Sequence, residues 1–203
     1  MAHRPYQHND HYSKRAKEES FVARSVFKLE EIDKRYRLLG KGDLVVDLGC
    51  APGSWLQYAS KATGPSGRLV GIDLSPVRAA LGSNVTVLQR DVSKVTDAEL
   101  RAALGGPADV VLCDMAPHTS GVRMVDQARS QALCDLALAV ARGVLRLGGK
   151  FLVKIFQGAD TPAYLKELRR HFATVLTFKP QSSRSESMET YAIAAGFRAA
   201  DAP

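Results

Sequence analysis

The chain has 203 residues, 45% of them hydrophobic, and a formal net charge of +7. This length suits one domain with a sizeable core, and no apolar run approaches the ~18 residues that a membrane-spanning helix needs. The three cysteines lack disulfide or zinc spacing, and the polar N-terminus lacks a secretory signal, so we expect a cytoplasmic protein without a metal site.

The N-terminal region divides into a polar segment and a helix. The polar composition of residues 1–17 predicts a flexible tail. Apolar residues such as Val26, Leu29 and Ile32 then recur at roughly helical spacing, which predicts an amphipathic helix over residues 18–38. Residues 18–198 should form one domain, and residues 199–203 a second short tail.

Strand-like and helical segments alternate after this helix. The predicted strands are 44–49, 68–74, 85–92, 108–115, 150–156, 173–179 and 189–197, with helices at 55–62, 97–104, 126–146 and 162–172. Alternation with continuously apolar strands predicts a parallel sheet covered by helices on both faces. No helix precedes the last strand, so that strand should run antiparallel. The predicted fold class is α/β: a Rossmann-like, class I methyltransferase sheet of seven strands, mostly parallel, with the last antiparallel.

The loop "DLGCAPGSW" follows the first predicted strand. Gly49 and Gly53 allow a tight turn and the close approach of a ligand. Asp47 would repel a pyrophosphate and suits a ligand with positive charge, such as the ammonium and sulfonium of S-adenosylmethionine. The alternative is an ordinary turn between a strand and a helix.

Carboxylates also end the next two strands. Asp73 can accept hydrogen bonds from ribose hydroxyls, and Asp91 can accept one from the amino group of an adenine. Either residue could instead cap a turn. Three carboxylates on three successive strands together favour an adenosyl ligand.

Further charged residues occur at the later strand ends. Asp114 ends the fourth strand, Lys154 lies inside the apolar run "FLVKIFQ", and Glu189 begins the last strand. An unpaired charge is costly to bury, which makes Lys154 unusual unless it reaches solvent from the strand end. Lys28, on the N-terminal helix, could be a surface charge.

Several motifs in order resemble one family. "ARSVFKLEEID", "VVDLGCAPGSW", "CDMAPHTSG", "GGKFLVKIFQG" and "KPQSSRSESMETYAIAAGF" are similar to the FtsJ/RlmE ribosomal RNA 2′-O-methyltransferases, over residues 14–198. The resemblance implies a catalytic set of Lys28, Asp114, Lys154 and Glu189. It implies S-adenosylmethionine contacts at Gly53, Trp55, Asp73, Asp91 and Asp114. The chain departs from the family pattern at Cys50, Ser54 and His118.

These residues suggest a mechanism for methyl transfer to a ribose hydroxyl. We expect Lys154 to accept the proton, Asp114 to align it, and Lys28 and Glu189 to hold the hydroxyl. Burial and a nearby cation both favour the neutral form of a lysine. Lys154 should be buried, with Lys28 as the second cation.

The charge distribution points to RNA. Residues 1–42 hold 10 Lys and Arg against 6 Asp and Glu, residues 43–141 hold 8 against 10, and residues 142–186 hold 9 against 3. The candidate phosphate contacts are Lys14, Arg15, Lys17, Arg24, Lys34, Arg169, Arg170, Lys179 and Arg184. Solvated surface charge is the alternative.

The leading hypothesis is a monomeric 2′-O-methyltransferase that acts on a uridine of large-subunit (23S) ribosomal RNA, with no membrane or metal partner. One alternative keeps the chemistry and changes the substrate to a tRNA anticodon loop. Another is a non-catalytic ribosome-assembly factor that binds RNA; the complete Lys-Asp-Lys-Glu set argues against it.

Overall fold

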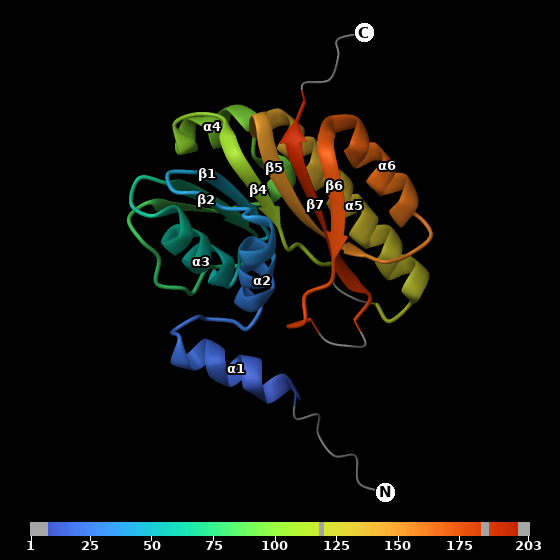
Figure 1. Cartoon of the computed structure of the whole chain (residues 1–203), viewed down its shortest axis with the longest axis horizontal. Coiled ribbons are helices and arrows are strands. Elements are labelled where there is room, and N and C mark those ends of the chain that lie inside the picture. Colours follow the sequence, from blue (N-terminus) through green and yellow to red (C-terminus); the bar gives the residue numbers. More distant parts are fainter. Residues whose placement is uncertain (1–7, 118–119, 184–186, 199–203) are drawn as a thin grey trace, which may run out of the picture.

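The computed structural model describes residues 8–117, 120–183 and 187–198, which form one seven-stranded sheet with helices on both faces (Figure 1). The strands are β1 (Leu44–Leu48), β2 (Arg68–Asp73), β3 (Val85–Gln89), β4 (Ala108–Cys113), β5 (Leu145–Phe156), β6 (Phe172–Phe178) and β7 (Glu189–Phe197). The helices are α1 (His8–Glu18), α2 (Val26–Tyr36), α3 (Ser54–Thr63), α4 (Asp97–Leu104), α5 (Arg123–Val144) and α6 (Thr161–His171), with a 3-10 turn, η1 (Val92–Lys94), after β3.

The strand order is β3-β2-β1-β4-β5-β7-β6. Neighbouring strands from β3 to β5 are parallel, whereas β7 lies antiparallel between β5 and β6. The connection from β6 to β7 is too short for a crossover helix, so β7 reverses direction beside β6. The predicted fold class is confirmed. The carboxyl ends of β1 to β6 meet at one edge of the sheet, called the carboxyl edge below.

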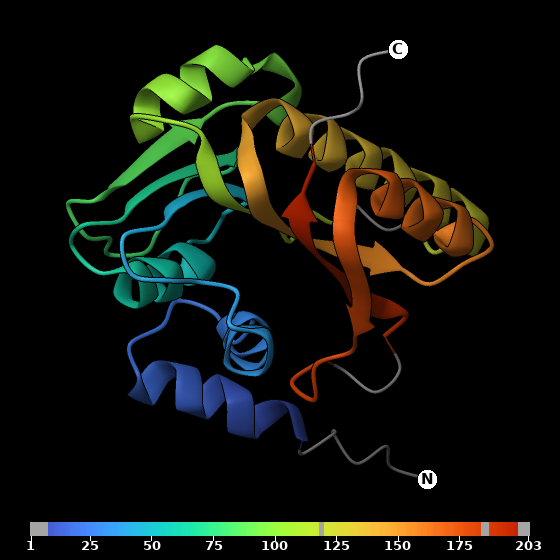
Figure 2. The same cartoon turned by 45° about the horizontal axis from the view of Figure 1, so that its top comes forward.

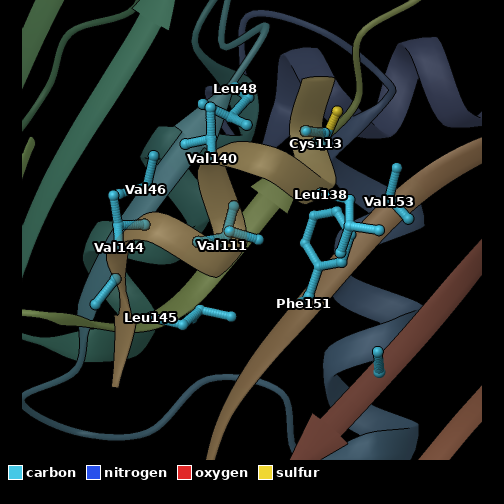
Figure 3. Close-up of a cluster of buried hydrophobic side chains, with 14 of the residues drawn as sticks. Val46, Leu48, Val111, Cys113, Leu138, Val140, Val144, Leu145, Phe151 and Val153 are labelled. Carbon is cyan, nitrogen blue, oxygen red and sulfur yellow. The ribbon is translucent and has the colours of Figure 1, made fainter. Parts of the chain in front are cut away.

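Two layers of helices cover the sheet, with α2 and α3 on one face and α4, α5 and α6 on the other (Figure 2). Alternate strand residues point to opposite faces. Val46, Val111 and Phe151 join the cluster that contains the buried residues of α5 (Figure 3). Val45 and Leu152 join the cluster under α2 and α3. The central strands are buried on both faces, which explains their continuous apolar sequences.

The N-terminal segment differs from its prediction. Residues 8–17, expected in a flexible tail, belong to α1, and the helix expected over 18–38 is interrupted between α1 and α2. Ser20 has a positive φ of 61°, so the chain turns after α1. Phe21 packs edge-on against Phe27 in a small cluster that also holds α1. The apolar spacing continues through the break because the loop residue packs on the same cluster as the helix.

The start of β5 also differs from its prediction. The helix expected over 126–146 ends at Val144, and β5 begins at the next residue rather than at residue 150. Gly148 lies in this extra length of strand, where the β4–β5 register shifts. A Cβ on Gly149 would lie 2.9 Å from the carbonyl oxygen of Arg146, so the irregular strand requires glycine there.

Candidate active site

Two ion pairs form at the carboxyl edge, on the face covered by α2 and α3. Lys154, in β5, places its Nζ 3.0 Å from Oδ1 of Asp114 and donates to the Asp114 carbonyl at 2.6 Å. Lys28, on α2, places its Nζ 2.5 Å from Oε1 of Glu189, the first residue of β7. The structure therefore arranges the four residues of the predicted catalytic set as two lysine–carboxylate pairs.

Tyr191 is a site residue that the motifs did not indicate. It lies opposite Lys154 in the β5–β7 register, and its hydroxyl donates to Oδ1 of Asp114 at 2.7 Å. Burial raises the pKa of Tyr191, and the carboxylates of Asp114 and Glu189 raise it further. The hydroxyl therefore stays protonated and acts as a donor at neutral pH. The available signal was its spacing of two from Glu189, which puts both on one face of a strand.

Strand geometry explains the position of Lys154. Leu152 packs under α2 and α3, and Lys154, two residues further along the strand, faces the same layer. Its side chain is only 7% exposed, and Asp114 provides the partner for its charge. The sequence predicted Lys28 as a cation that acts on Lys154, but in the structure Lys28 is paired with Glu189. Each of the two lysines, one buried and one partly buried, is thus compensated by a carboxylate.

A cavity of about 660 Å³ adjoins this cluster, between the loops after β1, β2, β3 and β4 and residues 129–136 of α5. Its lining includes the predicted cofactor residues Gly49, Asp73, Asp91 and Asp114. Met115, Leu133 and Leu136 contribute apolar surface to the lining. Apolar walls combined with a few polar groups fit a ligand that has a flat ring and hydroxyl or amino groups.

Asp73 and Asp91 also make local hydrogen bonds. Asp73 accepts the backbone amides of Ala51 at 2.9 Å and Ser75 at 2.7 Å. Asp91 accepts the amide and the hydroxyl of Ser93, both at 2.9 Å, and these bonds lower the pKa of Asp91. Both residues therefore stabilise turns, as the alternative reading allowed, and both also line the cavity.

Gly53, Trp55 and Asp47 do not line this cavity. Gly53 has φ 113°, and a Cβ there would lie 2.7 Å from Cγ1 of Val77, so the loop requires glycine. The indole of Trp55 donates to the carbonyl of Ser25 at 2.9 Å and connects α3 to the start of α2. The side chain of Trp55 thus supports the site from the helix layer.

Asp47 is a buried carboxylate on β1 with 1% exposure, and neither oxygen has a hydrogen-bond partner among the described residues. Burial raises the pKa of Asp47 well above its ordinary value, and the carboxylates of Asp114 and Asp73 raise it further. Such a group costs free energy unless a cation or donor reaches it. Asp114 and Asp73 line the cavity, so a cationic ligand bound there would offset the two carboxylates that raise the pKa of Asp47.

The basic residues expected to bind RNA are dispersed over the molecule. Five of them make contacts within the protein: Arg15 with Glu19 and Glu30, Lys34 with Glu30, Arg24 with the Ser182 carbonyl, Arg170 with Glu167, and Lys179 with the Ser187 carbonyl. Arg169 lies near the end of α6, which leads directly into β6, so it is at the edge of the sheet opposite the site. Lys14 and Lys17 are exposed on α1, beyond the carboxyl edge (Figure 1). Arg184 and His118 lie outside the described residues.

Comparison with known proteins decides the family. The model of the FtsJ-like methyltransferases matches residues 21–197. The chain belongs to the FtsJ-like methyltransferase family. It is 50% identical to the Ribosomal RNA large subunit methyltransferase E of Oleidesulfovibrio alaskensis, over 95% of this chain and 93% of that protein. The protein of the same name from Syntrophobacter fumaroxidans is 49% identical, over 93% of this chain and 95% of its own.

A solved structure agrees with this family. A Plasmodium falciparum protein described as a ribosomal RNA methyltransferase aligns with a TM-score of 0.76 and 28% identity, over 87% of this chain and 98% of that one. The predicted family and the predicted methyltransferase activity are confirmed. In the described parts of this FtsJ-like methyltransferase, no helix is both long and apolar enough to cross a membrane. Among the same residues, no group of three or more His, Cys, Asp or Glu side chains is placed to hold a metal ion.

Proposed function

We propose that this enzyme methylates the 2′-hydroxyl of a uridine in large-subunit (23S) ribosomal RNA, with S-adenosylmethionine as the methyl donor. The observation that carries the proposal is the double role of Asp114, which lines the cavity and also holds Lys154. A methyl donor bound in the cavity would lie on one side of the Asp114 carboxylate, and a hydroxyl beside Lys154 would lie on the other side, close to the donor. The names of the two bacterial relatives support the ribosomal substrate, which agrees with the expected cytoplasmic location.

The residues of the cavity fit this cofactor. Asp73 would accept the ribose hydroxyls and Asp91 the adenine amino group, while Met115 and Leu133 would contact the apolar ring. Asp47 would supply negative charge towards the cationic methionine part, which suits its lack of a described partner. This division of roles accounts for the acidic loop that follows β1.

The bound cofactor supplies an electrophilic methyl group on a sulfonium. Lys154 forms an ion pair with the Asp114 carboxylate, so its ammonium group must release one proton before it can act as a base. The amine that results has two N–H groups and one lone pair. The N–H groups of Lys154 can donate to the carbonyl and to Oδ1 of Asp114, which leaves the lone pair for the ribose hydroxyl. Nζ of Lys154 would take the hydroxyl proton while the ribose oxygen accepts the methyl group that the cofactor would supply.

The remaining polar groups position the reactants. Lys28 and Glu189 form a donor and acceptor pair that can hold the hydroxyl and its ribose. Tyr191 fixes the carboxylate of Asp114 from the opposite strand. These groups would act by orientation, since methyl transfer needs the hydroxyl oxygen in line with the methyl–sulfur bond.

Lys154→Ala tests the catalytic assignment. Loss of a general base should lower the turnover by roughly 100-fold or more, with the Kd for S-adenosylmethionine within a few-fold of the wild type. Lys150→Ala is the matched control, because Lys150 lies on the same strand but donates to the carbonyls of Arg37 and Leu38. Near-normal turnover of Lys154→Ala would show that the assigned role is wrong.

The substrate is tested separately. Labelled S-adenosylmethionine should transfer its methyl group to hypomethylated large ribosomal subunits and not to tRNA, and mass spectrometry should find the modification on a ribose. Transfer to tRNA alone would favour the anticodon-loop alternative. Tight RNA binding without methyl transfer to any RNA would favour the assembly factor.

A further inference from the structure

The first part of the loop between β6 and β7, residues 179–183, is held against α2 by a carboxylate that has no part in the mechanism above. Glu31 accepts the backbone amide of Gln181 on Oε2 at 2.7 Å and that of Ser182 on Oε1 at 2.9 Å. Arg24 donates to the Ser182 carbonyl at 2.7 Å. Ser182 is 1% exposed although it lies outside regular secondary structure. The loop backbone is therefore bonded to the α2 side through both its amides and a carbonyl.

The same loop leads to Glu189. The hydroxyl of Ser183 donates to Oε1 of Glu189 at 3.0 Å, and the same oxygen lies 2.5 Å from Nζ of Lys28. Lys28 and Glu31 are three residues apart on α2, so they project from the same side of the helix. These contacts form a closed ring that begins and ends on α2. Glu31 holds the loop at Gln181 and Ser182, the next residue Ser183 bonds Glu189, and Glu189 pairs with Lys28 on α2.

The ring fixes the direction of the Glu189 carboxylate. Oε1 has two donors, whereas Oε2 accepts no hydrogen bond from the described part of the chain. A carboxylate held by one oxygen presents the lone pairs of the other in a defined direction. Lys28 contacts Glu189 from the same helix that holds the loop. The orientation of the Glu189 carboxylate therefore depends on the position of the loop relative to α2.

We propose that Glu31 is a positioning residue: by binding the loop backbone it fixes Glu189 so that Oε2 meets the ribose 2′-hydroxyl of the RNA. This inference rests on the proposed function, in which Glu189 holds that hydroxyl. Hydrogen bonds from amides to a carboxylate are among the stronger ones in proteins. Two of them on neighbouring residues define both the position and the tilt of the loop.

Glu31→Gln tests the proposal with almost no change in size. The glutamine keeps one acceptor oxygen, but its NH₂ group faces a backbone N–H and cannot bond it. We expect the kcat on ribosomal subunits to fall about tenfold, by analogy with the loss of a charge-assisted hydrogen bond. The Kd for S-adenosylmethionine should stay unchanged.

Asp33→Asn is the matched control on the same helix. Asp33 also accepts two hydrogen bonds, from the Leu39 amide at 2.8 Å and the Tyr58 hydroxyl at 2.9 Å, and neither donor belongs to the loop. Its replacement should lower the Tm without a specific loss of kcat. A kcat loss in both variants that follows the Tm would overturn the proposal, because general destabilisation would then explain the effect.

A double-mutant cycle separates positioning from a merely structural role. If Glu31 acts through Glu189, then Glu31→Gln should lower kcat by less than about twofold in a Glu189→Gln background. Equal fold-losses in both backgrounds would mean that the two residues act independently, and the proposal would be wrong.

Hydrogen exchange keeps the test independent of catalysis. In Glu31→Gln, the amides of Lys179, of residues 181–183 and of residues 187–191 should exchange faster than in the wild type, by about tenfold at Gln181 and Ser182. Unchanged exchange in both segments overturns the positioning role even if the enzyme is active. If the wild type methylates no RNA, the proposed function fails, and the exchange measurement still decides whether Glu31 holds Glu189 in place.

Discussion

Asp47→Asn should change how the stability of the ligand-free protein depends on pH. Asp47 is 1% exposed and has no described hydrogen-bond partner. Burial, followed by the carboxylates of Asp114 and Asp73, raises its pKa in the folded state, whereas the unfolded chain has a pKa of about 3.9 there. Between these two values the unfolded protein has released a proton that the folded protein retains. The stability contributed below about pH 4 is therefore lost as the pH rises towards the folded pKa.

The magnitude follows from one proton. A difference of one bound proton changes the free energy of unfolding by about 1.4 kcal/mol per pH unit. From pH 5 to pH 7 the wild type should lose up to ~2.8 kcal/mol relative to Asp47→Asn, the full amount applying if the folded pKa exceeds 7. The asparagine cannot ionise, so the variant lacks this contribution to the slope.

Urea denaturation at pH 5, 6 and 7 measures the effect. Asp126→Asn is the control, because the backbone amide of Ser120, and that of Gly121 to a lesser extent, lower the pKa of Asp126. Asp126 is therefore ionised in both states across this range, and its variant should run parallel to the wild type. A constant free-energy gap between Asp47→Asn and the wild type at all three pH values would refute the reasoning about Asp47.

Three further outcomes are expected. Tyr191→Phe should lower the free energy of unfolding by about 1 kcal/mol in urea, through loss of the bond to Asp114, and should keep most of the methylation. Gly49→Ala should cost about 1–3 kcal/mol, because φ is +76° and its Cβ would lie 2.5 Å from Cγ of Met115; calorimetry should also show weaker cofactor binding. RNA affinity should fall steeply with salt, and replacing both Lys14 and Lys17 of α1 with glutamine should reduce the slope by roughly 1.5 units, at about 0.7 to 0.9 for each lost phosphate contact, whereas Arg169→Gln should not. A flat salt dependence would count against phosphate contacts by α1.

The strands of the sheet could be predicted because burial on both faces leaves a direct sequence signal. The expected strand at 189–197 has the observed bounds, and the helix at 97–104 does as well. Other boundaries differ where a local turn or tertiary packing outweighs the apolar pattern. The third strand ends at Gln89 rather than at residue 92, because Asp91 turns the chain by accepting the amide of Ser93. The N-terminal helix breaks at Ser20, since α1 packs back on α2.

The sequence by itself determined the order of the elements, the direction of the last strand and which charged residues lie at or near the strand ends. Those features follow from local periodicity and connection length, which need no knowledge of distant contacts. Only the tertiary structure decided how the charged residues pair, with Lys28 on Glu189 and Lys154 on Asp114. It also revealed the Tyr191 hydroxyl on Asp114. Strand order and register join segments far apart in the chain, and a difference of a few ångströms decides whether a lysine meets a carboxylate or another lysine.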